Sequence, residues 1–506
     1  MSRQKTKRAS VYRNLSHETH PHRCLHLFEI SLAGCLAPLA ALTALLLAPL
    51  AALHAATPGK PNIIFLFADD MGWGDLHCYG HPYAQTPNLD KLASEGTRFL
   101  QCYATGVTCV PSRAGFMTSR FPARFAKYPS VHGFGDRVTV TKLLKKQGYA
   151  TGHFGKWHLG PTEQPGTYGF DVINSDVSGN RPPSRDAARS RDARYFDHAV
   201  RFIEKHKDVP FYVNVWSIIP HHPVNPSQTL LDAFGPLQVD ESKFPAQMQE
   251  KFAICKKAGG DVSDHMRRYL AEIKSMDAEV GRLLRRLDEL GLSEKTIVVF
   301  SSDQGPAPTL VGATKLRVKP PDPNSEAGKR FAANNTDDLR LNAMGCAGPF
   351  RGGKTDQHEG GIRIPFIVRW PGHVPAGRVD ERSVISGADW LPTLGALTGT
   401  KVNAGDFDGE DASKAWLGGT HTRTKPLLWR TSSPLTPVAI REGKWKLHYP
   451  NSKRDQLELF DIATDPAEQH NLAKEQPDVV KSLSATLAAW QATLPKEYDR
   501  TNDTDK

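Results

Sequence analysis

Carboxylate side chains follow two apolar runs that are typical of buried strands. Asp69 and Asp70 come directly after the run 62–68, and Asp303 and Gln304 come shortly after the run 296–300. In open α/β sheets, binding sites form beyond the carboxyl ends of the strands. Adjacent carboxylates need a cation or shared protons, and an all-oxygen set suits Ca²⁺ or Mg²⁺ rather than zinc. The four residues are therefore candidate ligands of one divalent ion, with ordinary Asp–Gly turns as the alternative.

A third apolar run, 211–216, leads through a short segment into His221 and His222. Because histidine titrates near neutral pH, it is a natural acid for an alkoxide leaving group. A histidine taken alone is more often a solvated or hydrogen-bonded side chain. These two therefore become candidates only in the company of the other polar groups.

The segment 109–120 begins with Cys109-Val-Pro-Ser-Arg113. Pro111 suits the first turn of a helix, which places Cys109 at the helix N-terminus, where partial positive charge stabilises an anion. The alternative is a buried or disulfide-bonded cysteine beside a helix start. Five cysteines lie beyond residue 56 (Cys78, Cys102, Cys109, Cys255 and Cys346). An odd count in an exported protein indicates one thiol with another role.

The Cys109–Arg113 segment resembles the signature of type I sulfatases, in the alkaline-phosphatase-like superfamily, whose cysteine is oxidised to formylglycine by a separate enzyme. Residues 148–158 are similar to the second signature of that family, and short motifs between 459 and 472 resemble its C-terminal subdomain. The resemblance thus spans residues 61–494. The chain departs from the family pattern at three positions, where the family more often has a small residue, a glycine, and an asparagine or histidine: Val110, Ser119 and Gln304.

The resemblance implies a role for each matching residue. Cys109, as the formylglycine hydrate, supplies the hydroxyl that attacks sulfur, while Arg113 supports the hydrate and His158 donates a hydrogen bond to it. His222 is set aside, because the family histidine lies two residues before the proline. The remaining implied roles are sulfate binding by Lys156 and Lys354, protonation or orientation of the leaving oxygen by His221, and binding of one divalent ion, Ca²⁺ in preference to Mg²⁺, by Asp69, Asp70, Asp303 and Gln304.

These residue types suit sulfuryl transfer on chemical grounds as well. The reaction resembles phosphoryl transfer: charge spreads over the equatorial oxygens, so cations and positioning dominate catalysis. A metal ion, two lysines and an arginine would supply that field.

The rest of the chain predicts an α/β fold. Apolar runs alternate with amphipathic stretches, and the longest helix is expected over 264–290. Residues 364–368 form a further apolar run, whose internal Pro365 favours an edge or a strand start. The resemblance implies a large mixed, mostly parallel sheet sandwiched by helices. Closely spaced short strands after residue 401 and a helix over 478–494 predict a small antiparallel sheet with one helix.

We expect three parts along the chain: a signal peptide or N-terminal anchor (1–56), a catalytic α/β domain (57–405) and a C-terminal subdomain (406–506). The first part has basic residues followed by the apolar run 30–53, as in a secretory signal, although 24 residues could also span a bilayer. The protein is therefore expected to be exported, periplasmic or secreted, and to touch a membrane only if this segment is retained.

Charge excludes a nucleic-acid partner. Lys and Arg exceed Asp and Glu by 10 over the whole chain, but residues 1–56 contribute 4 of that excess, which leaves +6. This weak bias suits an anionic substrate. Two long polar stretches, 181–194 with its arginines and 306–344, are either substrate-facing or disordered.

The leading hypothesis is an exported sulfatase that cleaves a sulfate monoester on a sugar or polysaccharide and needs a formylglycine-generating enzyme for maturation. A phosphatase or phosphonate monoester hydrolase of the same superfamily is the second hypothesis, although only one set of metal ligands is visible. The third is a catalytically silent glycan-binding protein, correct if Cys109 is not converted.

Overall fold

The computed structural model describes residues 59–126, 133, 137–160, 166–175, 186–309, 322–334, 336–431, 437–450 and 456–498. The predicted signal peptide or anchor, residues 1–56, lies outside these ranges, and both its presence and the domain boundary near residue 405 stay predictions. Within the described ranges, no helix has both the length and the apolar character needed to cross a membrane.

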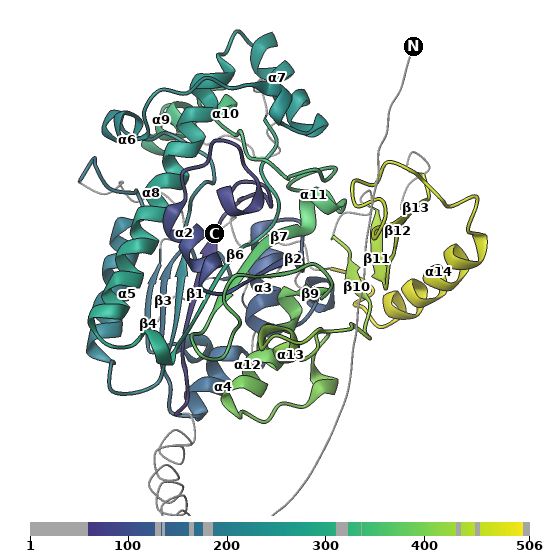
Figure 1. Ribbon diagram of the computed structural model, residues 1–506. Helices are drawn as coiled ribbons and strands as arrows, with labels where there is room; N and C mark the ends of the chain where they lie inside the picture. Colours follow the sequence, from purple (N-terminus) through teal and green to yellow (C-terminus); the bar gives the residue numbers. More distant parts are fainter. Residues whose placement is uncertain are drawn as a thin grey trace, which may run out of the picture. The chain divides into compact units, whose positions relative to one another are not determined.

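The large sheet of the described chain has nine strands, in the order β4-β3-β5-β1-β6-β7-β2-β8, with β9 paired to β2. The five strands from β4 to β6 are parallel, so their carboxyl ends meet at one edge. β7 runs antiparallel to both neighbours, which confirms a mixed, mostly parallel sheet (Figure 1). The strand bounds are β1 Asn62–Ala68, β2 Thr97–Tyr103, β3 Ala150–Gly155, β4 Val172–Ser175, β5 Phe211–Trp216, β6 Thr296–Ser302, β7 Arg363–Arg369, β8 Arg378–Asp380 and β9 Ile385–Ser386.

The proline in β7 does not mark an edge strand, so that alternative is wrong, although Pro365 is the third residue of the strand and lies close to its start. β7 lies inside the sheet, between β6 and β2. The register with β2 shifts between Phe99 and Cys102, opposite Pro365. A bulge leaves ladder groups unpaired, so the missing N–H of the proline costs no hydrogen bond there. The phenolic oxygen of Tyr79 accepts from the neighbouring Phe366 amide at 2.8 Å and completes the bonding.

Helices cover both faces of this sheet because the strands are apolar on both sides. In β1, Ile64, Leu66 and Ala68 pack with α5 and α8, whereas the alternate Ile63, Phe65 and Phe67 pack with α3 and α12. Figure 1 shows α5 and α8 on one side of the sheet, with α3 and α12 on the other. The helix bounds are α2 Pro87–Ser94, α3 Cys109–Thr118, α4 Val140–Lys146, α5 Ala193–Lys205, α6 Gln228–Phe234, α7 Ala246–Lys257, α8 Val262–Glu289, α9 Glu326–Asn334, α10 Asp337–Leu341, α11 Glu359–Ile362, α12 Trp390–Thr398, α13 Ser413–Trp416 and α14 Pro477–Ala492.

The predicted long helix corresponds to α8, and Gly291 follows it with φ +64°, as a glycine C-terminal cap requires. The polar stretch 306–344 is not structureless, because it contains α9 and α10.

The second sheet is antiparallel, in the order β10-β11-β12-β13, with α14 packed against it. Its strands are Leu427–Trp429, Val438–Glu442, Trp445–Tyr449 and Glu458–Asp461. This sheet shares a core with the large one: Tyr103 of β2 and Val107 pack among its buried side chains. The small antiparallel sheet with one helix is therefore confirmed, and it contacts the segment that precedes Cys109.

Candidate active site

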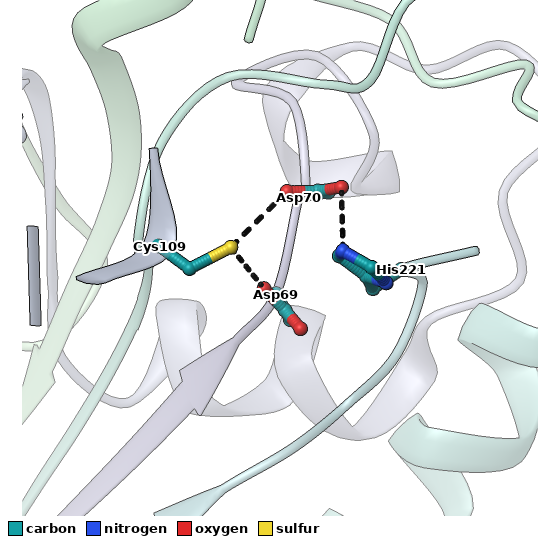
Figure 2. A group of neighbouring side chains, drawn as sticks. All are labelled: Asp69, Asp70, Cys109 and His221. Carbon is teal, nitrogen blue, oxygen red and sulfur yellow. Dashed lines mark hydrogen bonds and ion pairs between the residues drawn. The ribbon is translucent and has the colours of Figure 1, made fainter. Parts of the chain in front are cut away.

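Four side chains from three separate segments converge at the carboxyl ends of the parallel strands. Sγ of Cys109 lies 3.3 Å from Oδ1 of Asp69 and 4.0 Å from Oδ1 of Asp70, and Nε2 of His221 lies 3.7 Å from Oδ2 of Asp70. Figure 2 shows the sulfur pointing toward both aspartates, with His221 on the far side of Asp70. The aspartates end β1, His221 follows β5, and Cys109 begins α3.

Cationic side chains surround the same sulfur atom. Nζ of Lys156 and Nζ of Lys354 lie 3.5 and 3.7 Å from Sγ. Lys156 also donates to Asp69 at 2.5 Å and Lys354 to Asp70 at 2.7 Å. Arg113, fully buried one turn along α3, donates to Asp303 at 2.8 Å and lies 3.3 Å from Asp69. The three cationic side chains predicted from the sequence, Lys156, Lys354 and Arg113, therefore lie close together.

The remaining predicted oxygen donors complete the group. Asp303 accepts from the Asp70 amide at 3.0 Å, and the Gln304 amide nitrogen donates to Asp70 and lies 3.8 Å from the Cys109 sulfur. Oε1 of Gln304 is buried and has no hydrogen-bond partner among the described residues. A buried amide oxygen without a partner is costly, and a cation would satisfy it.

His158, which the resemblance assigns to the hydrate, and His222, which was set aside, differ in their contacts. His158 is partly buried, and its Nδ1 has no hydrogen-bond partner in the described part of the chain; the structure gives it no hydrogen bond to Cys109. His222 accepts, through its carbonyl oxygen, a hydrogen bond from Nδ1 of His221 at 2.7 Å. Setting His222 aside in favour of His221 therefore agrees with the geometry, since His221 is the one that faces Asp70.

Burial and charge shift the pKa values of the buried acids in opposite directions. Burial raises the pKa of Asp303 well above its ordinary value, and the charges of Asp69 and Cys109 raise it further. Burial alone would also raise the pKa of Asp69, but the charges of Lys156, His221 and Arg113 hold it well below the ordinary value. Burial and the neighbouring negative charges therefore disfavour the ionised form of Asp303, and a bound cation would favour it.

Burial also lowers the pKa values of the histidines in the site. It lowers the pKa of His158 to about 3, assisted by the charges of Lys156 and Arg113. The pKa of His221 is lowered by burial and by Lys156, while Asp70 and Asp69 oppose the shift.

The backbone adopts left-handed conformations at several positions near the site. Asp70 and His158, which follow β1 and β3, have φ values of 65° and 58°. Such conformations cost about 1–3 kcal/mol each and cluster at functional sites. Ser119 ends α3 with φ 52°, which explains why a glycine is common at this position of the family signature. Its hydroxyl accepts from the Leu391 amide at 2.8 Å and fixes the helix end.

The cysteine count does not single out Cys109. All five described cysteines are unpaired, so the disulfide alternative for Cys109 is wrong, and location alone distinguishes this thiol from the other four. Cys109 is the one at the carboxyl edge of the sheet, and only 5% of it is exposed.

The arginine-rich stretch is only partly described, and two of its arginines turn toward the protein itself. Arg189 pairs with Asp197 and Glu279 at 3.0 and 2.8 Å, and Arg191 lies 3.2 Å from Glu272. For these two residues the substrate-facing interpretation is wrong, because their charges are compensated by acids of α5 and α8. The residues 181–185 lie outside the described ranges.

A second group of titratable side chains lies where the small sheet contacts the segment that carries Lys354. His358, His448 and Glu468 place ligand atoms within 4.8 Å of one another. Nζ of Lys446 already lies 3.0 Å from Glu468 and 2.9 Å from Glu359, so an ammonium group compensates these acids. We interpret the group as a structural ion-pair network. Sequence reasoning missed it, since no local pattern pairs Lys446 with two acids so far away in the chain.

We predict that His358 makes the stability of the fold depend on pH. Burial would lower its pKa, but hydrogen bonds to Asp356 (2.6 Å) and Glu458 (3.2 Å) raise it to about 9. Protonated His358 therefore stabilises the fold fully below its ordinary pKa of about 6.5, and this contribution, at most about 3 kcal/mol, is lost as the pH rises through 9. In urea denaturation, the free energy of unfolding should decrease less between pH 6.5 and 10 for His358→Gln than for the wild type. The exposed His373→Gln variant is the control, and an unchanged slope in His358→Gln would contradict the assignment.

A mixed α/β sheet whose carboxyl edge joins a cysteine, three carboxylates and three cations suits an enzyme that hydrolyses anionic esters. The sulfatase family model matches residues 61–400, and a model described as the C-terminal part of N-sulphoglucosamine sulphohydrolase matches residues 353–493. The chain belongs to the sulfatase family and is a sulfuric ester hydrolase.

Individual relatives agree with the family. Human arylsulfatase A is 30% identical over 87% of this chain and 89% of its own. An N-acetylgalactosamine-6-O-sulfatase of Bacteroides thetaiotaomicron is 28% identical over 85% of this chain and 92% of its own. The solved structure of a protein in complex with its substrate D-glucosamine-2-N,6-O-disulfate has the same fold, with a TM-score of 0.64 and 23% identity over 88% of this chain and all of that one.

Proposed function

We propose that this enzyme cleaves a sulfate monoester on a sugar, with the side chain at position 109 as nucleophile after conversion to formylglycine. The observation that carries the proposal is the surroundings of one atom: Lys156, Lys354 and two aspartates all lie within 4.0 Å of Sγ of Cys109. A nucleophile held beside two ammonium groups can attack a negatively charged ester, because the cations offset the repulsion.

We further propose that Asp69, Asp70, Asp303 and Gln304 hold one Ca²⁺ ion. The residues fit such an ion, since the donors are all oxygen, the Gln304 oxygen lacks a partner among the described residues and burial with nearby negative charge raises the pKa of Asp303. When bound, the ion would supply positive charge that polarises the sulfate group and stabilises the anionic nucleophile.

The chain's own residues account for the other parts of the reaction. One hydroxyl of the hydrated aldehyde at position 109 attacks sulfur and loses its proton, and the bond from sulfur to the sugar oxygen breaks, which leaves the sulfo group on residue 109. Deprotonation of the second hydroxyl then expels sulfate and restores the aldehyde, which water hydrates again. Lys156 and Lys354, which contact both the aspartates and the sulfur atom, can bind the sulfate oxygens as charge develops on them. His221, when protonated on both ring nitrogens, would give the proton at Nε2 to the departing oxygen.

The support for a sugar substrate is chemical and comparative. The three carboxylates and three full cations of the site cancel, so a divalent ion makes it electropositive and suited to an anionic ester. Among the relatives, the Bacteroides thetaiotaomicron protein is named for sulfate removal from N-acetylgalactosamine. We also propose maturation by a formylglycine-generating enzyme and export to the periplasm or the exterior, the latter on the basic and apolar pattern of residues 1–56.

The rates of hydrolysis of a sulfate ester and of related phosphorus esters test this function. We expect 4-nitrophenyl sulfate to be hydrolysed with a kcat/KM on the order of 100-fold above that of 4-nitrophenyl phosphate or phenylphosphonate, because the described residues of the site offer ligands for one metal ion rather than two. A panel of sulfated hexosamines, including N-acetylgalactosamine 6-sulfate, then identifies the sugar by release of sulfate. Preference for the phosphorus esters would favour the phosphonate hydrolase alternative. Sugar binding without sulfate release, together with an unmodified thiol at position 109, would favour the silent glycan-binding alternative.

A further inference from the structure

The segment 217–223 brings His221 from the end of β5 into the site, and it belongs to no helix or strand. Its backbone must therefore be fixed by groups outside the sheet ladder. One anchor is direct, because the amide of Asp69 donates to the carbonyl oxygen of Ile219 at 3.1 Å. The segment is thereby tied to the same aspartate that contacts Cys109.

The second anchor is the guanidinium group of Arg191. It donates to three carbonyl oxygens of this segment: Pro223 at 2.9 Å, Ile218 at 3.2 Å and His221 at 2.6 Å. The guanidinium is a rigid planar fork of donors, so three simultaneous bonds fix where these carbonyls lie. The side chain is 16% exposed, and Glu272 of α8 lies 3.2 Å from its Nε.

The neighbouring Asp192 reinforces this anchor from the start of the segment. It accepts from the Ile218 amide at 3.1 Å and from the Ser217 hydroxyl. Glu272 also accepts from the Asn225 amide at 3.3 Å, just beyond the segment. Arg191 and Asp192 therefore hold the segment that carries His221 at its start, at His221 and at its end, and Glu272 holds a residue just beyond it.

The orientation of the His221 ring depends on this backbone. Nδ1 of His221 lies 2.7 Å from the His222 carbonyl oxygen, which can only accept, so Nδ1 carries a proton. Nε2 is then the nitrogen turned to the site, 3.7 Å from Asp70. A shift of the 221–222 backbone would rotate Nε2 away from the position that a leaving oxygen must occupy.

We propose that Arg191 is a positioning residue for His221: its three hydrogen bonds hold the segment so that Nε2 faces the leaving oxygen. The proposal rests on the proposed function, in which His221 protonates that oxygen. It also gives a role to the arginine-rich stretch, whose Arg191 acts on the site through the backbone rather than by binding substrate.

Leaving-group dependence tests the proposal. The departure of 4-nitrophenolate needs little protonation, whereas phenolate benefits from a general acid, which contributes about 10²–10⁴-fold. We expect Arg191→Met to lower kcat/KM for phenyl sulfate by about 100-fold and that for 4-nitrophenyl sulfate by less than about 5-fold. The ratio of the two constants is the measured quantity, because it does not depend on how much of the enzyme is folded and converted.

Matched variants complete the experiment. Arg189→Met changes a neighbouring arginine that pairs with Asp197 and Glu279, and it should leave the ratio unchanged. His221→Ala removes the acid itself and should therefore give the largest change in the ratio. The double variant His221→Ala/Arg191→Met should have the same ratio as His221→Ala. If Arg191→Met is inactive on both esters, Arg191→Lys decides, with an expected shift in the same direction.

Equal losses on both esters, or a double variant with a ratio beyond that of His221→Ala, would overturn the positioning role. A His221→Ala ratio equal to that of the wild type would overturn it as well, since no acid would then need positioning. A wild-type enzyme that cleaves neither sulfate ester would instead overturn the proposed function.

Discussion

Replacing Cys109 by alanine is expected to lower sulfate ester hydrolysis by at least about 10⁴-fold, because the nucleophile is removed while the cationic surroundings remain. The fold should persist, since the side chain is small and its contacts are with Asp69, Lys156 and Lys354 rather than with the core. The measurement is kcat/KM for 4-nitrophenyl sulfate, with thermal unfolding of both proteins.

The matched control is Cys78→Ala, which removes another unpaired thiol, on a residue whose amide donates to Asp90 of α2. It should retain near wild-type activity. Mass spectrometry of the peptide that bears residue 109 should show the aldehyde or its hydrate in active enzyme. Substantial residual turnover by Cys109→Ala would refute the nucleophile assignment, and an unmodified thiol in fully active enzyme would refute the conversion.

Removal of the divalent ion is expected to lower activity by more than about 100-fold, since the ion would stabilise transition-state charge. Addition of Ca²⁺ should restore the rate. Because an ion that binds only the folded state stabilises it, the unfolding temperature should also fall on chelation. Metal analysis provides a readout apart from activity: we expect one Ca²⁺ per chain, lost in Asp303→Asn.

The group formed by His358, His448 and Glu468 provides the control for the proposed calcium site. His448→Gln alters the other cluster with metal-binding residue types and should leave the calcium content unchanged. Calcium that is retained in Asp303→Asn but lost in His448→Gln would place the ion in the small sheet instead. Activity that is indifferent to chelators would contradict the four-oxygen site.

Much of the site could be predicted because its residues directly follow strands with strong apolar patterns. Asp69, Asp70 and Asp303 end runs of buried residues, and parallel strands place such ends together. Cys109 and Arg113 are one helical turn apart, so a helix start at residue 109 brings both toward the same edge. The C-terminal sheet could also be predicted from the sequence, because its short strands are separated by turn residues such as Gly443, whose φ is 57°.

The predictions that are wrong concern contacts between distant segments. Pro365 suggested an edge strand, but a bulge in β2 allows the proline inside the sheet. The stretch 181–194 looked available to a substrate, because the acids Glu279 and Glu272, which pair with its Arg189 and Arg191, lie more than 80 residues further along the chain. Ion pairs of this kind depend on tertiary packing, and no local periodicity indicates them.

The near-complete burial of Cys109 bears on whether its side chain could be oxidised before or after the chain folds. Only 5% of Cys109 is accessible, and its first helical turn is covered on all sides. If Cys109 is converted to formylglycine as proposed, a second enzyme would have little access to the thiol in the folded molecule, and we expect the oxidation to precede folding. Folding would then compete with maturation, and a chain that folds first would keep an unmodified thiol.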